Sequence, residues 1–179
     1  MKPLFIFILL LSSKAVFAQE TEDFHAPRYA KQAIGQSGVS VYLPQTEDLG
    51  IELSLSEDSS EVYTVDVEES GYHYAGIVVK LYGTTLESAE ERESLLIDYM
   101  DFLMSTFNIT EVVGYGKGHT LESNPDAVGV IDYWYDDEDV WAVKGWATKT
   151  HLVILMLYGA DEYPSITSQS LFLNGVRFE

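Results

Sequence analysis

The sequence predicts an α+β fold in which an antiparallel β-sheet meander is flanked by helices. Three observations lead to this class. Short segments in which apolar and polar residues alternate occupy much of the chain, and this period of two is typical of strands. Only one long segment, residues 84–108, has apolar residues at spacings of three and four. The later strands are joined by short turns, which favour antiparallel neighbours over parallel ones.

The N-terminus, residues 1–18, has the features of a secretory signal peptide. Lys2 precedes an apolar run, and the small residues Val16 and Ala18 stand at positions −3 and −1 of a cleavage site. A transmembrane anchor would need about 20 mostly apolar residues, and the apolar run here is much shorter. We therefore expect cleavage before Gln19, no transmembrane segment, and an exported protein that is periplasmic or extracellular.

The remaining length is typical of one domain. We predict that residues 38–179 form a single α+β domain. Residues 19–37 lack a sustained period and are predicted to be a leader or linker with at most a short helical turn, over residues 28–34. The chain has no cysteine, which excludes disulfides, thiol catalysis and cysteine metal sites, so packing alone must stabilise the fold.

The charge balance is strongly acidic. The formal net charge is −19, from 10 basic and 29 acidic residues. Two basic residues and no acidic ones lie in the signal peptide, so cleavage leaves 8 basic against 29 acidic residues, a mature charge of −21. Such a surface repels nucleic acid and anionic lipid, and it suits solubility, divalent ions or cationic partners. We expect an unknown protein or small ligand as partner, and no nucleic acid.

Self-repulsion of this charge is expected to limit the stability of the fold at neutral pH. Moderate salt screens charges on the surface, so it should raise the melting temperature of the mature protein. Thermal unfolding followed by circular dichroism from low to moderate salt measures the effect. A melting temperature that does not change over this range would contradict the expectation.

Four strands are predicted before the long helical segment, over residues 39–43, 51–55, 62–67 and 72–82. The second and third show clear alternation, and proline stops the first. The fourth is almost continuously apolar in its second half, which indicates a strand that is covered on both faces.

A single long helix follows these strands. Thr84 and Glu87 have the spacing of a capping box. One apolar stripe runs along the segment, and Asn108 is a plausible stop. Asn108 also begins a glycosylation sequon, which matters only in a host that glycosylates such sites. The stripe consists of Ala89, Leu96, Tyr99, Met100, Leu103 and Phe107.

The second half of the chain is predicted to be mostly sheet. Residues 109–120 form a strand that glycines interrupt, and a turn follows. A meander of three strands comes next, and a final helix over residues 165–173 ends at an Asn-Gly pair. The meander strands are residues 127–135, 140–148 and 151–158, and the central residues of their turns are 137–138 and 149–150.

This order of elements resembles the PsbP-like fold group. The resemblance rests on the Leu43-Pro44 strand end, the long central helix, the meander and the terminal Phe172-Leu173-Asn174-Gly175-Val176-Arg177-Phe178 segment. It covers residues 38–179 and is closest to the uncharacterised exported bacterial members. The resemblance implies an α/β/α sandwich that acts as an accessory or binding domain. Known members of the group include photosystem subunits and proteins that bind a GTPase. The sequence has no motif for either kind of binding, so no functional residue is carried over.

Motifs for catalysis and metal binding are weak. The four histidines, His25, His73, His119 and His151, are scattered, and no Gly-x-Ser-x-Gly nucleophile elbow is present. The acidic turn at residues 136–139 lacks the ligand spacing of a calcium loop. The glycines of residues 114–118 are not followed by the helix that a phosphate-binding loop requires. We therefore expect no cofactor, no metal and no catalytic residue that the sequence alone identifies.

The only site candidate is a row of aromatic residues. The predicted turns place Trp134 opposite Trp141, and Trp141 opposite Tyr158, on one face of the sheet. The row is either part of the core or, at its end near the acidic turn, an uncovered aromatic patch. In the second case, Asp136 and Asp139 would border a contact surface for a partner or ligand.

Two functions from different classes fit these observations. Export, acidity and the lack of a catalytic motif favour a non-enzymatic binding or accessory module. The alternative is an extracytoplasmic hydrolase whose carboxylates come together only in the fold. A pocket with two convergent carboxylates and a histidine would favour the hydrolase, and a flat or aromatic surface would favour binding. A purely structural envelope protein is a third hypothesis.

Overall fold

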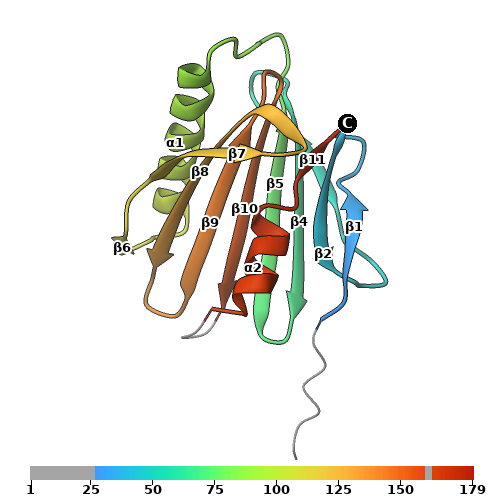
Figure 1. The fold of residues 1–179 in the computed structure, drawn as a ribbon, viewed down its shortest axis with the longest axis vertical. Helices are drawn as coiled ribbons and strands as arrows, with labels where there is room; N and C mark the ends of the chain where they lie inside the picture. The colour runs from blue at the N-terminus through green and yellow to red at the C-terminus, as the bar shows by residue number, and fades with distance from the viewer. Residues whose placement is uncertain (1–26, 160–162) are drawn as a thin grey trace, which may run out of the picture.

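The computed structural model describes residues 27–159 and 163–179. Over these ranges the chain forms two antiparallel sheets and two α-helices, which is an α+β fold (Figure 1). The predicted signal peptide, its cleavage site and His25 lie outside the described residues. Within these residues, neither helix combines the length and the apolar composition of a membrane span.

The larger sheet has eight antiparallel strands in the order β3-β4-β5-β10-β9-β8-β6, and β7 also pairs with β8. The central strand β10 is buried from its second to its seventh residue, as its apolar run predicts. The strands are β3 (Glu52–Leu55), β4 (Glu61–Glu69), β5 (Tyr72–Lys80), β6 (Glu111–Val112), β7 (Gly116–Leu121), β8 (Asn124–Tyr135), β9 (Val140–Ala147) and β10 (His151–Gly159).

The register predicted for the meander is confirmed. Trp134 lies opposite Trp141, and Trp141 lies opposite Tyr158. Two short turns fix this register. The Asp136 N–H donates to the Asp139 carbonyl at 3.2 Å, and the turn after β9 is closed in the same way between residues 148 and 151.

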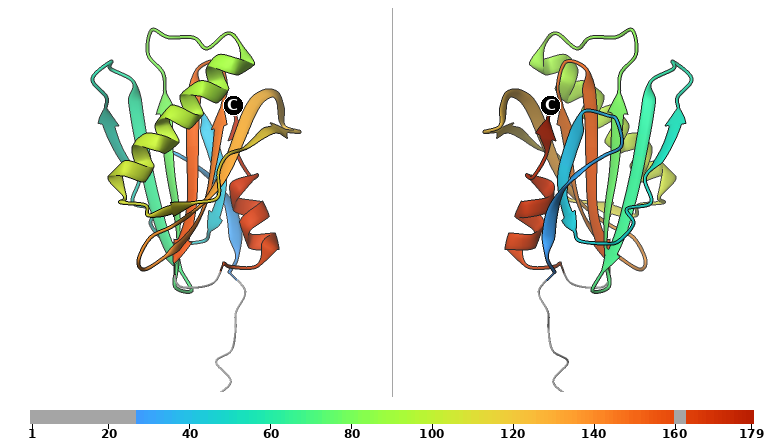
Figure 2. Two further views of the ribbon diagram at one scale, coloured as in Figure 1. Left: turned by 90° about the vertical axis from the view of Figure 1, so that its left-hand side faces the viewer. Right: turned by 90° about the vertical axis from the view of Figure 1, so that its right-hand side faces the viewer.

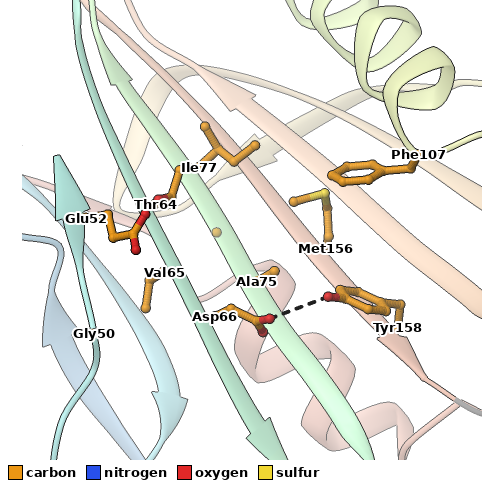
Figure 3. Close-up of a pocket in the computed structure, with 11 residues that line it drawn as sticks. Gly50, Glu52, Thr64, Val65, Asp66, Ala75, Ile77, Phe107, Met156 and Tyr158 are labelled. Atoms are coloured by element: carbon orange, nitrogen blue, oxygen red, sulfur yellow. Dashed lines mark hydrogen bonds between the residues drawn. The ribbon is translucent and has the colours of Figure 1, made fainter. Parts of the chain in front are cut away.

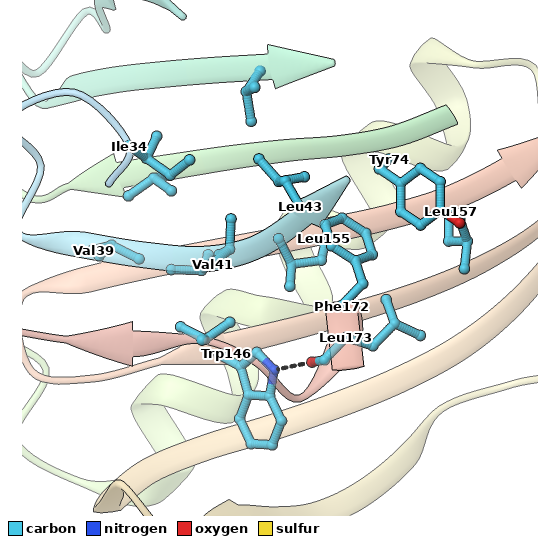
Figure 4. Close-up of a cluster of buried hydrophobic side chains, with 14 of the residues drawn as sticks. Ile34, Val39, Val41, Leu43, Tyr74, Trp146, Leu155, Leu157, Phe172 and Leu173 are labelled. Carbon is cyan, nitrogen blue, oxygen red and sulfur yellow. Dashed lines mark hydrogen bonds between the residues drawn. The ribbon is translucent and has the colours of Figure 1, made fainter. Parts of the chain in front are cut away.

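One face of the large sheet is covered by a small sheet and a short helix. The small sheet has the order β1-β2-β11, with β1 (Tyr29–Ala33), β2 (Val39–Pro44) and β11 (Arg177–Phe178), and the helix is α2 (Ile166–Leu173). Figure 2 shows both on the side opposite the long helix. Their apolar side chains meet those of the large sheet in one core (Figure 4), where the Trp146 indole donates to the Leu173 carbonyl at 2.7 Å.

The predicted helical turn over residues 28–34 is wrong, because Tyr29–Ala33 is the edge strand β1. Pairing with β2 satisfies the backbone groups on one edge of this segment. The Tyr29 hydroxyl also donates to the Tyr74 hydroxyl at 2.8 Å, and Ile34 is buried directly after the strand. Part of the predicted leader therefore contributes to the core.

The long helix α1 (Ala89–Thr106) packs on β8 and β9 across the other face of the sheet. Its apolar stripe forms a second core with the facing strand residues. Asn108 follows the helix with φ of 54°, the left-handed conformation of many helix ends. The C-terminus of the helix thus lies where the sequence predicts it.

The start of α1 differs from the prediction. The capping box is formed by Ser88 and Glu91, one turn later than the predicted pair Thr84 and Glu87. The segment before Ser88 is held to the sheet, because the Leu86 N–H donates to the Lys149 carbonyl at 2.9 Å. That contact keeps the preceding turn from joining the helix.

The predicted strand over residues 109–120 is divided into β6 and β7. Gly114 lies between them with φ of 108°, a conformation that favours glycine. Its N–H donates to the buried Asp132 carboxylate at 2.8 Å. This carboxylate also accepts from the Tyr133 N–H and the Trp134 indole. Asp132 therefore holds the segment between β6 and β7 against β8.

Candidate functional site

A pocket of about 370 Å³ lies on the α1 side of the large sheet, over β3, β4, β5 and β10. We call it the trough. Helix α1 packs on β8 and β9, and the trough occupies the part of the face beyond them (Figure 3). Its floor and walls are formed mainly by Glu52, Thr64, Asp66, Ala75, Ile77, Phe107, Met156 and Tyr158.

The pairing of the strands explains why these side chains share the trough. Thr64 pairs with Glu52 on one side and with Ile77 on the other. In the next row Asp66 pairs with Ala75, which in turn pairs with Met156. Since paired residues in antiparallel strands point to the same face, the polar members gather toward β3 and the apolar members toward β10.

A stack of aromatic rings forms the wall nearest to α1. The Tyr158 ring lies between His73 and Trp141, with centroid distances of 4.7 and 3.9 Å and interplanar angles of 5° and 13°. Phe107, the C-cap residue of α1, stacks on Trp141 at 5.3 Å. Each ring is held by the next. Because both faces of the Tyr158 ring are covered, Tyr158 lines the trough with its edge and its hydroxyl.

Asp66 connects this stack to the floor. Its carboxylate lies 3.0 Å from His73 Nδ1 and accepts a long hydrogen bond of 3.5 Å from the Tyr158 hydroxyl (Figure 3). Burial raises the pKa of Tyr158 to about 12, and the nearby carboxylates of Asp66 and Asp139 act in the same direction. Tyr158 is therefore a neutral phenol over the physiological range.

The trough has an apolar floor and an acidic border. Glu52 and Asp66 are exposed at its border, while Ala75 and Met156 are buried beneath. No lysine or arginine is among the described residues that line it. A ligand that fits this surface has an apolar part for the floor and a positive charge for the border.

The five predicted contact residues do not form an open aromatic patch. Trp134 and Trp141 share a face, but they are only 0% and 6% exposed. The Asp136 carboxylate accepts from the backbone N–H groups of Glu138 and Asp139 and from the Trp141 indole at 2.9 Å. Trp141 and Asp136 thus support the wall, and Trp134 belongs to the core on the α1 side of the sheet. Of the five residues only Tyr158 lines the trough.

The Asp136 pKa reflects this closed turn. Partial burial acts to raise the pKa, but the hydrogen bonds from Glu138, Asp139 and Trp141 outweigh it and leave the value below that of an ordinary aspartate. Asp136 is therefore an ionised structural acceptor, already engaged by its own hairpin.

Glu52, Thr64 and Asp66 were not predicted from the sequence as site residues. The alternation of Thr64 and Asp66 with Tyr63 and Val65 is visible in the sequence, and it places one polar row on one face. The missing information was the sheet order, since β5 pairs with the distant β10. That pairing brings the polar row beside the side chains of β10.

Other chemistry has less support at this site. Among residues 27–159 and 163–179, no group of three or more histidine or carboxylate side chains is arranged to hold a metal ion. Comparisons with protein-family models, with curated protein sequences and with solved structures gave no match for this chain. The geometry of the trough therefore carries the functional argument.

Proposed function

We propose that this protein is an exported, non-enzymatic binding module that takes an organic ammonium ligand in the trough. The observation that carries the proposal is the combination of an apolar floor, an aromatic wall and two carboxylates at the border, with no basic residue among the described lining residues. Carboxylates attract organic cations by their charge, and an apolar floor suits the hydrocarbon part of such a ligand.

The size and construction of the trough support this proposal. A volume of about 370 Å³ is within the range of small-molecule sites. The lining residues come mostly from paired strands, and Tyr158 is clamped between two rings. A site built on rigid elements loses little conformational entropy when a ligand binds.

At the level of the fold, we infer that the large sheet, with α1 on one face and α2 on the other, is a variant of the PsbP-like sandwich. The small β1-β2-β11 sheet beside α2 is an addition to that plan. Membership of that group would fit an accessory or binding role, which agrees with the trough.

Isothermal titration with octyltrimethylammonium tests the binding proposal, with octanoate as the probe of opposite charge. We expect the cation to bind and octanoate to give no measurable heat of binding. Asp66→Asn keeps the shape and removes the charge, so the affinity for the cation should fall about tenfold, or ~1.4 kcal/mol.

Glu138→Gln is the matched control, because Glu138 is an exposed acid at the hairpin tip and lies outside the trough. It removes the same charge and should leave the affinity nearly unchanged. Equal binding of octanoate, or equal losses in the Asp66 and Glu138 variants, would contradict the proposed site.

A hydrolase is the second candidate function, and one contact favours it. The 3.0 Å distance between Asp66 and His73 Nδ1 is the arrangement that orients a histidine for acid–base chemistry. Hydrolysis of nitrophenyl ester and phosphate substrates by the wild type, lost in His73→Gln, would support it. No turnover above that of His73→Gln would leave Asp66 and His73 as part of the binding wall.

A further inference from the structure

Lys144 lies on the face of the large sheet opposite the trough, where it points toward α2. It is only 4% exposed, although lysine is almost never fully buried unless it is paired. Among the described residues, no carboxylate forms an ion pair with it, whereas Lys80, Lys117 and Lys149 each have one. In a chain with 29 acidic residues, this uncompensated burial requires an explanation.

The Lys144 amine is held by three groups from different elements. Nζ donates to Asn174 Oδ1 at 2.7 Å, at the C-cap of α2, and it lies 3.2 Å from His119 Nδ1 on β7. It also lies 4.6 Å from the centre of the Trp146 ring. All three partners are uncharged acceptors or a ring face, so the amine is fixed in position without a counter-charge.

Gly129 on β8 makes this arrangement possible. A Cβ atom at residue 129 would lie 2.4 Å from Trp146 Cζ3 and 2.9 Å from His119 Cβ. The absence of a side chain there lets the indole and the imidazole approach the strand together. Gly129 therefore lets Trp146 and His119, two of the contacts of Lys144, pack side by side.

A small pocket reaches this amine. It has a volume of about 160 Å³ and is lined by Lys144 and Asn174 together with Tyr133, Ser170 and Leu173. Since Nζ is in contact with Asn174, the amine lies at the wall of the pocket. A volume of this size admits a molecule of only a few non-hydrogen atoms.

The surroundings ease the loss of a proton from the amine. Burial lowers the pKa of Lys144 to about 8. Burial, and then the charge of Lys144, also lower the pKa of His119, so the imidazole is an uncharged base at neutral pH. A lysine whose pKa is lowered by desolvation is the kind that acts as a nucleophile.

We propose that Lys144 is a nucleophilic amine that condenses with a small aldehyde or ketone in this pocket, with His119 as its base. The Nζ lone pair attacks the carbonyl carbon, and His119 takes the proton that Nζ releases. That proton passes to the oxygen and gives a carbinolamine. His119 then takes the second Nζ proton and delivers it to the hydroxyl, which leaves as water as the C–O bond breaks and the C=N bond forms. Amine and carbonyl compound thus give an imine and water, with no oxidant or reductant.

Reductive trapping tests this assignment on the intact protein. Propanal and cyanoborohydride at pH 7 convert an imine into a stable propyl adduct, which peptide mapping by mass spectrometry locates. At this pH the neutral fraction of an amine with pKa about 8 is roughly 200-fold that of an exposed lysine. Allowing for restricted access, we expect Lys144 to react at least about tenfold faster than Lys149.

Lys149 is the internal reference because it is more than half exposed and paired with Glu87. His119→Asn should slow trapping at Lys144 and leave the rate at Lys149 unchanged, which a purely structural role would not produce. Trapping at Lys149 that is as fast as at Lys144 would overturn the proposal. An unchanged rate at Lys144 in the His119 variant would overturn the role of His119 as base.

Discussion

Phe172→Ala is expected to lower the free energy of unfolding by about 3–5 kcal/mol. Phe172 is 0% exposed in the core beneath α2. Its ring packs edge-on against Tyr74 at 5.3 Å, and Tyr74 packs in the same way against Tyr29 at 5.8 Å. Removal of this ring therefore leaves a cavity where α2, the large sheet and the small sheet meet (Figure 4).

Chemical denaturation measures this loss, and Ile166→Ala on the same helix is the control. Ile166 is 84% exposed, so its truncation should change stability by less than about 0.5 kcal/mol. Equal stabilities of the two variants would show that the core between α2 and the sheets is not packed as described.

Alkaline pH is expected to unfold the protein, starting above pH 10. Burial raises the pKa of Tyr158 to about 12, and burial and hydrogen-bonded neighbours raise the pKa values of Tyr74, Tyr115 and Tyr163 still further. A pKa that is higher in the folded than in the unfolded state gives stability that is complete below the unfolded value, near 10, and lost as pH rises through the folded value. For Tyr158 this interval is about pH 10 to 12.

The titration of Lys144 changes the stability in the opposite direction, and it does so at lower pH. Its pKa is about 8 in the fold, against 10.5 for an unperturbed lysine, so the unfolded chain binds more protons between these limits and stability rises with pH there. Unfolding free energies at pH 7, 9 and 11 for the wild type and Lys144→Met measure both effects. Stability that still rises from pH 9 to pH 11 would contradict the assignment to buried tyrosines.

The elements that are determined by the pattern of nearby residues were predicted well. The meander register follows from two tight turns, and the predicted pairing of Trp134, Trp141 and Tyr158 is that of the structure. The end of α1 follows from Asn108. These features depend on a few consecutive residues, and no distant pairing competes with them.

The elements that depend on distant partners were missed. Strand β1 has no strong alternation, and its conformation comes from pairing with β2 and from the contact between Tyr29 and Tyr74. The predicted capping box at Thr84 and Glu87 does not form, and the helix begins one turn later at Ser88. The Leu86 contact with the Lys149 carbonyl holds the earlier turn to the sheet.

The trough could not be predicted for the same reason. Asp66 and Tyr158 are 92 residues apart, and only the β4-β5-β10 order brings them together. The sequence identifies the aromatic row correctly, but it does not indicate that α1 and Phe107 cover the tryptophans. Within the large sheet, the uncovered part of the face lies beside the β5-β10 pairing, which joins the strands farthest apart along the chain.

Methyl NMR of isotopically labelled protein during titration with octyltrimethylammonium tests the central claim most directly. Binding in the trough predicts saturable shifts in the methyl signals of Ile77 and Met156, on its floor. Signals of Val41 and Leu43, in the core on the other face, should not move. Shifts that are spread over both faces, or that are largest away from Ile77 and Met156, would contradict binding in the trough.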